Sequence, residues 1–219
     1  MAEIVYLDSP LESEALFERL CPPVRQWFKD KFPDFTPPQK LAIPAIMDQQ
    51  HLLLCSPTGS GKTLTAFLTV IDQLVRLALE RKLEKKVHAI YISPIKALAN
   101  DIQRNLIGPL NEITEHYLPD RAQEIRVGLR TGDTSQSDRQ KMLRNPPHIL
   151  ITTPESLAIA ITSPRFQPIV SEVEYMIIDE LHSMVSTKRG VHLSLTLSLL
   201  DSLLKNLSLI HISEPTRPC

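Results

Sequence analysis

The feature that most constrains this chain is a short glycine-containing loop between an apolar run and a long helical pattern. The apolar run covers residues 51–55, and the helical pattern extends from 64 to about 79. The loop between them reads Ser56-Pro57-Thr58-Gly59-Ser60-Gly61-Lys62-Thr63. Strand, glycine loop, lysine, hydroxyl residue and helix, in this order, are the layout of a phosphate-binding loop. The sequence therefore predicts a nucleotide site at this point.

Each part of the loop has an expected role. The glycines let the backbone turn its N–H groups towards phosphate oxygens, and the helix behind adds its positive N-terminal end. Lys62 is expected to reach the β- and γ-phosphates, and the Thr63 hydroxyl to bind Mg²⁺. The other predicted nucleotide contacts in the loop are Ser56, Thr58, Gly59, Ser60 and Gly61. Ser56 stands where the strict pattern has glycine, but a small residue fits there. The alternative interpretation is a chance turn before a helix. A Gly-Lys-Thr run between a strand and a helix favours the phosphate-binding loop over this alternative.

Composition limits the class of protein. A chain of 219 residues with 42% hydrophobic residues can bury a core of one large domain, or one and a half smaller ones. The net charge of −1 gives no hint of a nucleic-acid partner, so any such partner must be argued from local sites. The three cysteines are scattered without metal or disulfide spacing, which fits a reducing cytoplasm. We find no apolar stretch of membrane-spanning length and no signal-peptide pattern. We therefore expect a cytoplasmic chain with no membrane partner.

Apolar runs alternate with helical patterns along the chain. The predicted strands are 51–55, 87–92, 125–129, 148–152 and 173–179. This alternation predicts an α/β fold with a mostly parallel sheet covered by helices on both faces. Right-handed crossovers place the carboxyl ends of all strands at one edge, where such folds bind ligands. The polar motifs directly follow the strands, at 56–63, 93–96, 130–134, 152–155 and 179–182. One composite site at that edge is therefore expected.

Two adjacent carboxylates follow the last of these strands. Asp179 at the strand end can be aimed at the Mg²⁺ beside Thr63. Glu180 can orient and deprotonate the water that attacks the nucleotide. An acidic turn without chemistry is the alternative, because Asp-Glu pairs are common. The combination with a phosphate loop predicts Lys62, Asp179 and Glu180 as the catalytic residues.

Taken together, the motifs resemble the first RecA-like P-loop domain of a superfamily 2 helicase, over about residues 30–206. The run Phe35-Thr36-Pro37-Pro38-Gln39 resembles the adenine-reading segment, and Asp179-Glu180-Leu181-His182 resembles the DExH box. The stretches 130–136 and 187–193 are similar to those of the large helicase-related (Lhr) proteins. The resemblance implies ATP and Mg²⁺ as cofactors, with Gln39 in contact with the adenine base. It also implies that His182 couples the ATP site to the nucleic-acid strand. The alternative for His182 is a buried structural histidine.

The resemblance also implies a nucleic-acid path along the same edge. The implied contacts are Pro94, Lys96, Thr131, Gly132, Thr152, Thr153 and Pro154. Helix starts and hydroxyl groups of this kind hold phosphates without reading bases. A helix cap with no ligand is the alternative for each Thr-Pro pair. We expect a single nucleic-acid strand as the partner, with DNA favoured over RNA. A repair role is expected from the resemblance alone. The sequence does not indicate a protein partner.

The expected organisation has three parts. They are an N-terminal helical segment at 1–34, the ATP-binding RecA-like domain at 35–206 and a tail at 207–219. The tail follows the last helix, where the family's Ser-Ala-Thr motif is expected. It instead matches one reading frame of the Nextera transposon-end sequencing adapter, so we expect it to be non-native and to pack poorly.

The family's mechanism needs a second RecA-like domain with arginine fingers, so this chain is expected to be a fragment with absent or feeble turnover. A P-loop module with a switching role unrelated to helicases is the alternative function. The motifs at 130–134 and 152–155 favour the helicase, because a kinase or transporter ATPase has no use for additional phosphate-gripping loops.

Overall fold

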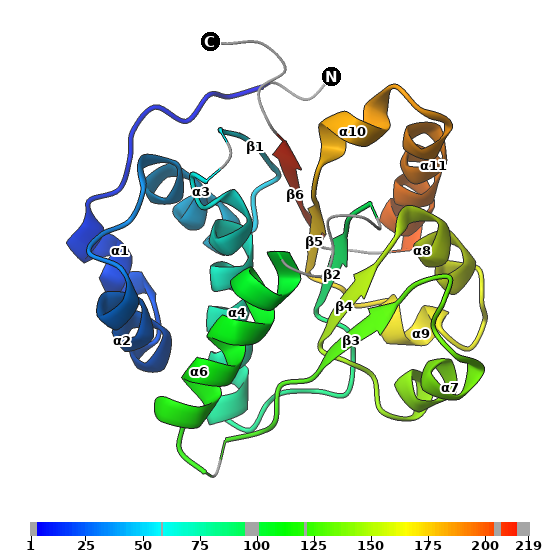
Figure 1. The fold of residues 1–219 in the computed structure, drawn as a ribbon, viewed down its shortest axis with the longest axis horizontal. Coiled ribbons are helices and arrows are strands. Elements are labelled where there is room, and N and C mark those ends of the chain that lie inside the picture. Colours follow the sequence, from blue (N-terminus) through cyan, green and yellow to red (C-terminus); the bar gives the residue numbers. More distant parts are fainter. Residues whose placement is uncertain (1–3, 58, 95–100, 121, 204–206, 214–219) are drawn as a thin grey trace.

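A computed structural model describes residues 4–57, 59–94, 101–120, 122–203 and 207–213 (Figure 1). Its centre is a six-stranded sheet with the strand order β1-β6-β5-β2-β4-β3, and all neighbouring strands pair in parallel. The strands are β1 Leu52–Cys55, β2 Ala89–Ile92, β3 Val127–Arg130, β4 Ile149–Thr152, β5 Tyr175–Ile178 and β6 Ser208–Ser213. The expected α/β architecture with a parallel sheet is confirmed.

Helices cover both faces of the sheet, as Figure 1 shows. The first face carries α1 Ser13–Arg19, α2 Pro22–Lys31, α3 Pro37–Met47, α4 Lys62–Leu79, a π-helical turn Gln103–Ile107 and α6 Gly108–His116. The second face carries α7 Gln136–Arg144, α8 Pro154–Ile161, α9 Gln167–Val170, α10 Leu181–Val185 and α11 Lys188–Leu203. Successive strand residues point to opposite faces, so Tyr91 joins the first core while Ile90 and Ile92 join the second.

The N-terminal helices belong to the first core. Leu16 and Phe28 pack in the same cluster as the residues of α4. A buried carboxylate fixes the contact, because Asp72 of α4 accepts a hydrogen bond from the Cys21 N–H at 2.6 Å and one from Arg76 Nε at 2.7 Å. The segment predicted as 1–34 thus shares one core with the sheet.

The prediction that the tail packs poorly is wrong for residues 208–213. They form β6, which lies between β1 and β5 and pairs with both. Ile210 and Ile212 are buried in the first core, with 0% and 1% of their surface exposed. The slot supplies hydrogen-bond partners on both sides, and any alternating segment with β-branched residues at the inward positions can fill it. The sheet therefore has six strands in place of the expected five.

We predict that β6 contributes much of the stability. Truncation after residue 206 leaves β1 and β5 without a shared neighbour and opens the first core to water. The free energy of unfolding should fall by about 3 kcal/mol or more relative to a chain that ends at residue 213. Urea unfolding of the two chains provides the measurement. Equal midpoints would show that 208–213 adds nothing, as the sequence had suggested.

A polar cluster lies at the opposite edge, near the amino ends of the strands. His148 is 1% exposed; its Nδ1 accepts a hydrogen bond from the Arg126 N–H at 3.0 Å, and its Nε2 lies 3.0 Å from Arg126 Nη2. Burial, together with the positive charge of Arg126 and the neighbouring His88, lowers the pKa of His148 to about 4 from an ordinary 6.5. His148 is therefore neutral in the folded protein near neutral pH.

This shift predicts a pH dependence of stability. The folded pKa lies below the unfolded one, so protonation favours the unfolded chain. The contribution of His148 should be complete above pH 6.5 and should be lost as the pH falls towards 4. In His148→Gln the unfolding midpoint should depend less on pH over this range, whereas exposed His192→Gln should follow the parent. Identical pH profiles for the parent and His148→Gln would contradict this assignment.

Candidate functional site

The glycine loop after β1 has the backbone geometry of an anion site. Gly59 and Gly61 have φ angles of +82° and +84°, in the left-handed region that favours glycine. Helix α4 begins directly after Gly61, so the N–H groups of its first turn face the loop without intrahelical acceptors. The Lys62 ammonium donates to the carbonyl of Ser56 across the loop. Ser60 Oγ is buried and has no hydrogen-bond partner among the described residues. This set of donors fits phosphate oxygens.

The predicted adenine-reading segment braces the same loop. The Thr36 hydroxyl donates to the Ser60 carbonyl at 3.0 Å, and the Thr36 N–H donates to Gln39 Oε1 at 2.8 Å. Gln39 is 3% exposed, and its Nε2 lies only 2.9 Å from the position that a Cβ on Gly61 would occupy. Gln39 is thus held against the loop with its amide nitrogen facing it.

A cleft of about 780 Å³ gathers most of the predicted nucleotide residues. Its lining includes Gln39, Gly59, Gly61, Lys62, Thr63, Asp179 and Glu180. Ser56 and Ser60 support the loop from outside this lining, and Thr58 lies outside the described residues. The opposite wall was not predicted. It is formed by residues of α2 and of the π-helix–α6 segment, among them Trp27, Phe32, Arg104 and Glu112.

The sequence offers only an indirect signal for that wall. The indole Nε1 of Trp27 in α2 donates to Glu112 Oε2 in α6 at 2.7 Å, so the two helices are joined across the wall. A π-helical turn is rare and often marks a functional site, yet its presence depends on tertiary packing.

The acidic pair lies at the end of β5. Asp179 is 4% exposed, and its carboxylate accepts hydrogen bonds from the Tyr91 hydroxyl and from the Glu180 N–H, the latter at 2.8 Å. Burial raises the pKa of Asp179 above its ordinary value. A cation in the cleft would offset this cost, so the carboxylate and Thr63 fit a Mg²⁺ ion. No described group of three or more His, Cys, Asp or Glu residues could hold a metal, so nucleotide phosphates would have to complete that shell.

Glu180 has an unusual backbone. Its φ of +52° lies in the left-handed region, which costs a non-glycine residue about 1–3 kcal/mol. The turn opens α10 and directs the Glu180 carboxylate into the cleft, 3.2 Å from His182 Nε2. The other ring nitrogen of His182 lies 3.3 Å from Ser213 Oγ on β6. His182 therefore links the acidic pair to the neighbouring strand end.

The predicted strand contacts follow adjacent strands. Strands β2, β4 and β3 are neighbours, and Thr152 is in register with both Ile92 and Arg130. Pro94, the segment 152–154 and the segment 131–132 therefore leave the sheet side by side, whereas Lys96 lies outside the described residues.

The two threonine hydroxyls at the start of α8 are engaged within the protein. Thr152 Oγ1 donates to the Arg130 carbonyl at 2.8 Å, and Thr153 Oγ1 caps α8 by accepting from the Ser156 N–H at 3.4 Å. Thr153 thus forms the cap of α8. Phosphate contact at this point would have to come from backbone N–H groups of the helix start.

An ion pair fixes the start of α8 against α11. Arg189 Nε and Nη2 donate to the two carboxylate oxygens of Glu155 at 2.6 and 3.2 Å. The pair lowers the pKa of Glu155, and its bidentate form fixes orientation. The next residue, Gly190, permits a close approach, since a Cβ there would lie 2.3 Å from the Met184 carbonyl of α10.

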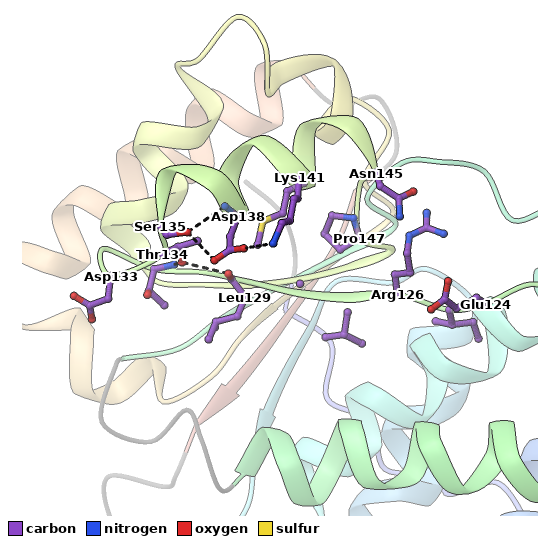
Figure 2. Close-up of a pocket in the computed structure, with 15 residues that line it drawn as sticks. Glu124, Arg126, Leu129, Asp133, Thr134, Ser135, Asp138, Lys141, Asn145 and Pro147 are labelled. Carbon is purple, nitrogen blue, oxygen red and sulfur yellow. Dashed lines mark hydrogen bonds and ion pairs between the residues drawn. The ribbon is translucent and has the colours of Figure 1, made fainter.

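Another hollow, of about 800 Å³, lies along edge strand β3 and helix α7 (Figure 2). On the side of the hollow formed by α7, Figure 2 shows the Asp138 carboxylate accepting hydrogen bonds from Ser135 and Lys141. Thr131 is the one predicted site residue in its lining. The residues predicted to bind nucleotide therefore lie in the cleft at the loop and not in this hollow.

A parallel sheet with a phosphate loop after β1 and an acidic pair after β5 defines a P-loop nucleotide-binding domain. The family model described as "DEAD/DEAH box helicase" matches residues 36–213, and the chain belongs to this family.

Individual relatives confirm the resemblance to Lhr proteins. "ATP-dependent helicase Lhr-Core" of Methanocaldococcus jannaschii is 50% identical over 203 residues, covering 92% of this chain and 24% of the relative. "Lhr helicase/uracil glycosylase" of Escherichia coli is 45% identical, covering 90% of this chain and 13% of the relative. The solved Mycobacterium smegmatis helicase Lhr, bound to ssDNA and AMP-PNP, is 43% identical with a TM-score of 0.80, covering 91% of this chain and 25% of that one. The chain thus spans about a quarter or less of these proteins. No helix within the described ranges is long and apolar enough to cross a membrane.

The loop geometry predicts different costs at its two glycines. Gly59→Ala should lose about 1–2 kcal/mol of unfolding free energy, because alanine must adopt a positive φ with nothing within 4 Å of its Cβ. Gly61→Ala meets the same backbone cost and also crowds Gln39, so it should lose more. Chemical unfolding of both variants gives the comparison. A smaller loss in Gly61→Ala than in Gly59→Ala would contradict the contact between loop and Gln39.

Proposed function

We propose that this chain is the first RecA-like domain of an ATP-dependent nucleic-acid helicase or translocase, which binds and hydrolyses ATP in step with strand binding. The observation that carries the proposal is the shared cleft of Lys62 and Thr63 with Asp179 and Glu180, since phosphoryl transfer needs these groups together. The similarity to the solved Mycobacterium smegmatis helicase Lhr, which is bound to ssDNA and AMP-PNP, supports it.

The residues of the cleft have distinct proposed tasks. Lys62 leaves the Ser56 carbonyl and pairs with the β- and γ-phosphates, while the first N–H groups of α4 hold their oxygens. Gln39 contacts the base. Thr63 and Asp179 would hold Mg²⁺, which would neutralise phosphate charge. Glu180, directed into the cleft by its left-handed backbone, orients the attacking water and accepts its proton.

The strand is proposed to cross the other half of the same edge. Its phosphates meet Pro94, Lys96, the segment 131–132 and the helix start at 152–154 without base readout. A single strand is proposed, with DNA favoured over RNA. His182 is proposed to couple the two halves because of the DExH resemblance, and its contact with the Glu180 carboxylate at 3.2 Å joins it to the nucleotide side.

Complete activity is proposed to need more than this chain. A second RecA-like domain would close the cleft and supply arginine fingers, which contribute a factor on the order of 10³–10⁵ in related sites. The proposed ATP-binding domain covers residues 35–206, and residues 207–219 are proposed to derive from an adapter sequence. On this view β6 is a foreign segment that occupies the slot after the last helix, where the family's Ser-Ala-Thr motif is expected.

Two substitutions test the assignment in the cleft. Lys62→Ala should raise the dissociation constant of MgATP tenfold or more, because a charge-assisted contact to the phosphates is lost. Glu180→Gln should bind MgATP within about threefold of the parent, because the base acts on water and not on the nucleotide. Titration calorimetry on this chain measures both constants. In a longer protein that contains the second domain, Glu180→Gln should abolish strand-stimulated ATP hydrolysis, and hydrolysis at the parental rate would refute the base assignment.

A further inference from the structure

The free edge of β3 carries backbone groups that point away from the sheet. Among the described strands, β3 is the last in the sheet and pairs with β4 alone. The carbonyls of Arg126 and Arg130 accept hydrogen bonds from groups of β4 at 3.2 and 2.8 Å. Backbone groups alternate in direction from one residue of a strand to the next, so those of Val127 and Leu129 face the open side.

Most of these outward groups are unpaired in the part of the chain that the structure describes. The Leu129 carbonyl accepts a hydrogen bond from Thr134 Oγ1 at 3.3 Å. The Leu129 N–H and both backbone groups of Val127 have no hydrogen-bond partner there. An open strand edge of this kind is a template for another extended segment, which supplies the matching carbonyls and N–H groups.

Helix α7 turns this edge into a groove. The hollow of about 800 Å³ along β3 is lined by residues 124–129 on one side and by Met142 and its neighbours in α7 on the other (Figure 2). Ordinary ligand sites have volumes of roughly 300–1,000 Å³, so the hollow has room for a bound segment.

Apolar side chains lie beside the edge on both faces of the sheet. Leu129 is 52% exposed and is in register with Ile151 of the first core, so its side chain lies on the first face. Met142 packs against the second core. The side chains of an added strand alternate between the two faces, so it would contact Leu129 on one face and Met142 on the other.

The two ends of the groove are acidic. Figure 2 shows Asp133 near one end of the hollow and Glu124 near the other. Both are exposed, and neither carboxylate has a hydrogen bond or an ion pair with a described residue. The remaining carboxylate of the lining, Asp138, already pairs with Lys141 at 3.0 Å. Basic side chains at the two ends of an added strand would therefore meet free opposite charges.

The same charges disfavour two other occupants. If β3 paired with β3 of a second copy about a two-fold axis, Glu124 of each copy would lie close to Asp133 of the other, and these like charges repel. A nucleic-acid strand would bring its phosphates to the same carboxylates. An extended peptide with basic ends has neither conflict.

We propose that the groove between β3 and α7 is a docking site for an extended segment of a partner protein, which adds to the sheet beside β3. The segment pairs its backbone with Val127 and Leu129, directs apolar side chains towards Leu129 and Met142, and carries Lys or Arg at both ends. This interaction is separate from nucleotide and nucleic-acid binding, and it does not depend on either.

The probe is an acetylated and amidated heptapeptide of alternating valine and threonine between two terminal lysines, titrated into the 219-residue chain. Amide hydrogen exchange followed by NMR is the readout. At a free peptide concentration of about nine times the dissociation constant, exchange of the Val127 and Leu129 amides should slow about tenfold, because they exchange only in the free chain. The Gly128 amide faces β4 and should exchange slowly with and without peptide.

Two controls separate backbone pairing from general attraction. The same peptide with all interior amides N-methylated keeps its charge but loses its backbone donors, and should bind about tenfold more weakly or worse. Glu124→Lys should weaken binding of the original peptide about threefold or more. Glu115→Lys makes the same charge change on an exposed residue of α6 outside the hollow, and should bind like the parent.

Each outcome decides the question. Saturable binding with slowed exchange at Val127 and Leu129 supports the docking site. Absence of binding, equal binding of the N-methylated peptide, or protection centred on other residues would overturn it. Equal effects of Glu124→Lys and Glu115→Lys would overturn the basic ends of the segment.

Two further measurements address the other occupants. Slow exchange of the Val127 and Leu129 amides in the peptide-free chain, together with a dimer mass in sedimentation, would assign the edge to a second copy and overturn the proposal. Slow exchange of the same amides on addition of oligo(dT) alone would assign the edge to nucleic acid, with the same consequence.

Discussion

Parallel pairing in matched register is the constraint on which the rest of the structure depends. Ile92 is in register with Thr152 on one side and with Ile178 on the other, and Thr152 is in register with Arg130. Four neighbouring strands therefore end on one line. The residues that follow these ends emerge side by side, although they are far apart in the sequence. The positions of the candidate sites along the edge follow from this alignment.

The same edge concentrates features that cost stability. Asp179 is a buried carboxylate, and Glu180 adopts a left-handed backbone. Two apolar cores, one on each face of the sheet, hold these groups in place. Such costs are typical of sites in which a ligand supplies the missing partner. In our account that ligand is a nucleotide with its metal.

Much of the fold and part of the site could be predicted from the sequence, for physical reasons. The run from Gly59 to Thr63 and the Asp179-Glu180 pair are local patterns, so adjacent residues carry their chemistry. The strand runs are apolar and bounded by turn residues, so their positions were predicted to within two residues. The sequence does not predict β6, because a segment that resembles adapter sequence is expected to pack poorly, whereas the sheet needs only alternation and backbone partners. The wall at Glu112 depends on contacts between distant segments, which no local pattern encodes.

The central claim is that one edge of the sheet holds a nucleotide and a strand at separate, adjacent places. Backbone NMR of the 24.7 kDa chain, titrated with Mg²⁺–AMP-PNP and separately with oligo(dT), tests it most directly. The account predicts that the nucleotide shifts the amide signals of residues 59–64 and 179–182. It predicts that the oligonucleotide shifts those of 130–134 and 152–156. Shifts from both ligands on the same residues, or oligonucleotide shifts centred on His88 and His148 at the opposite edge, would contradict it.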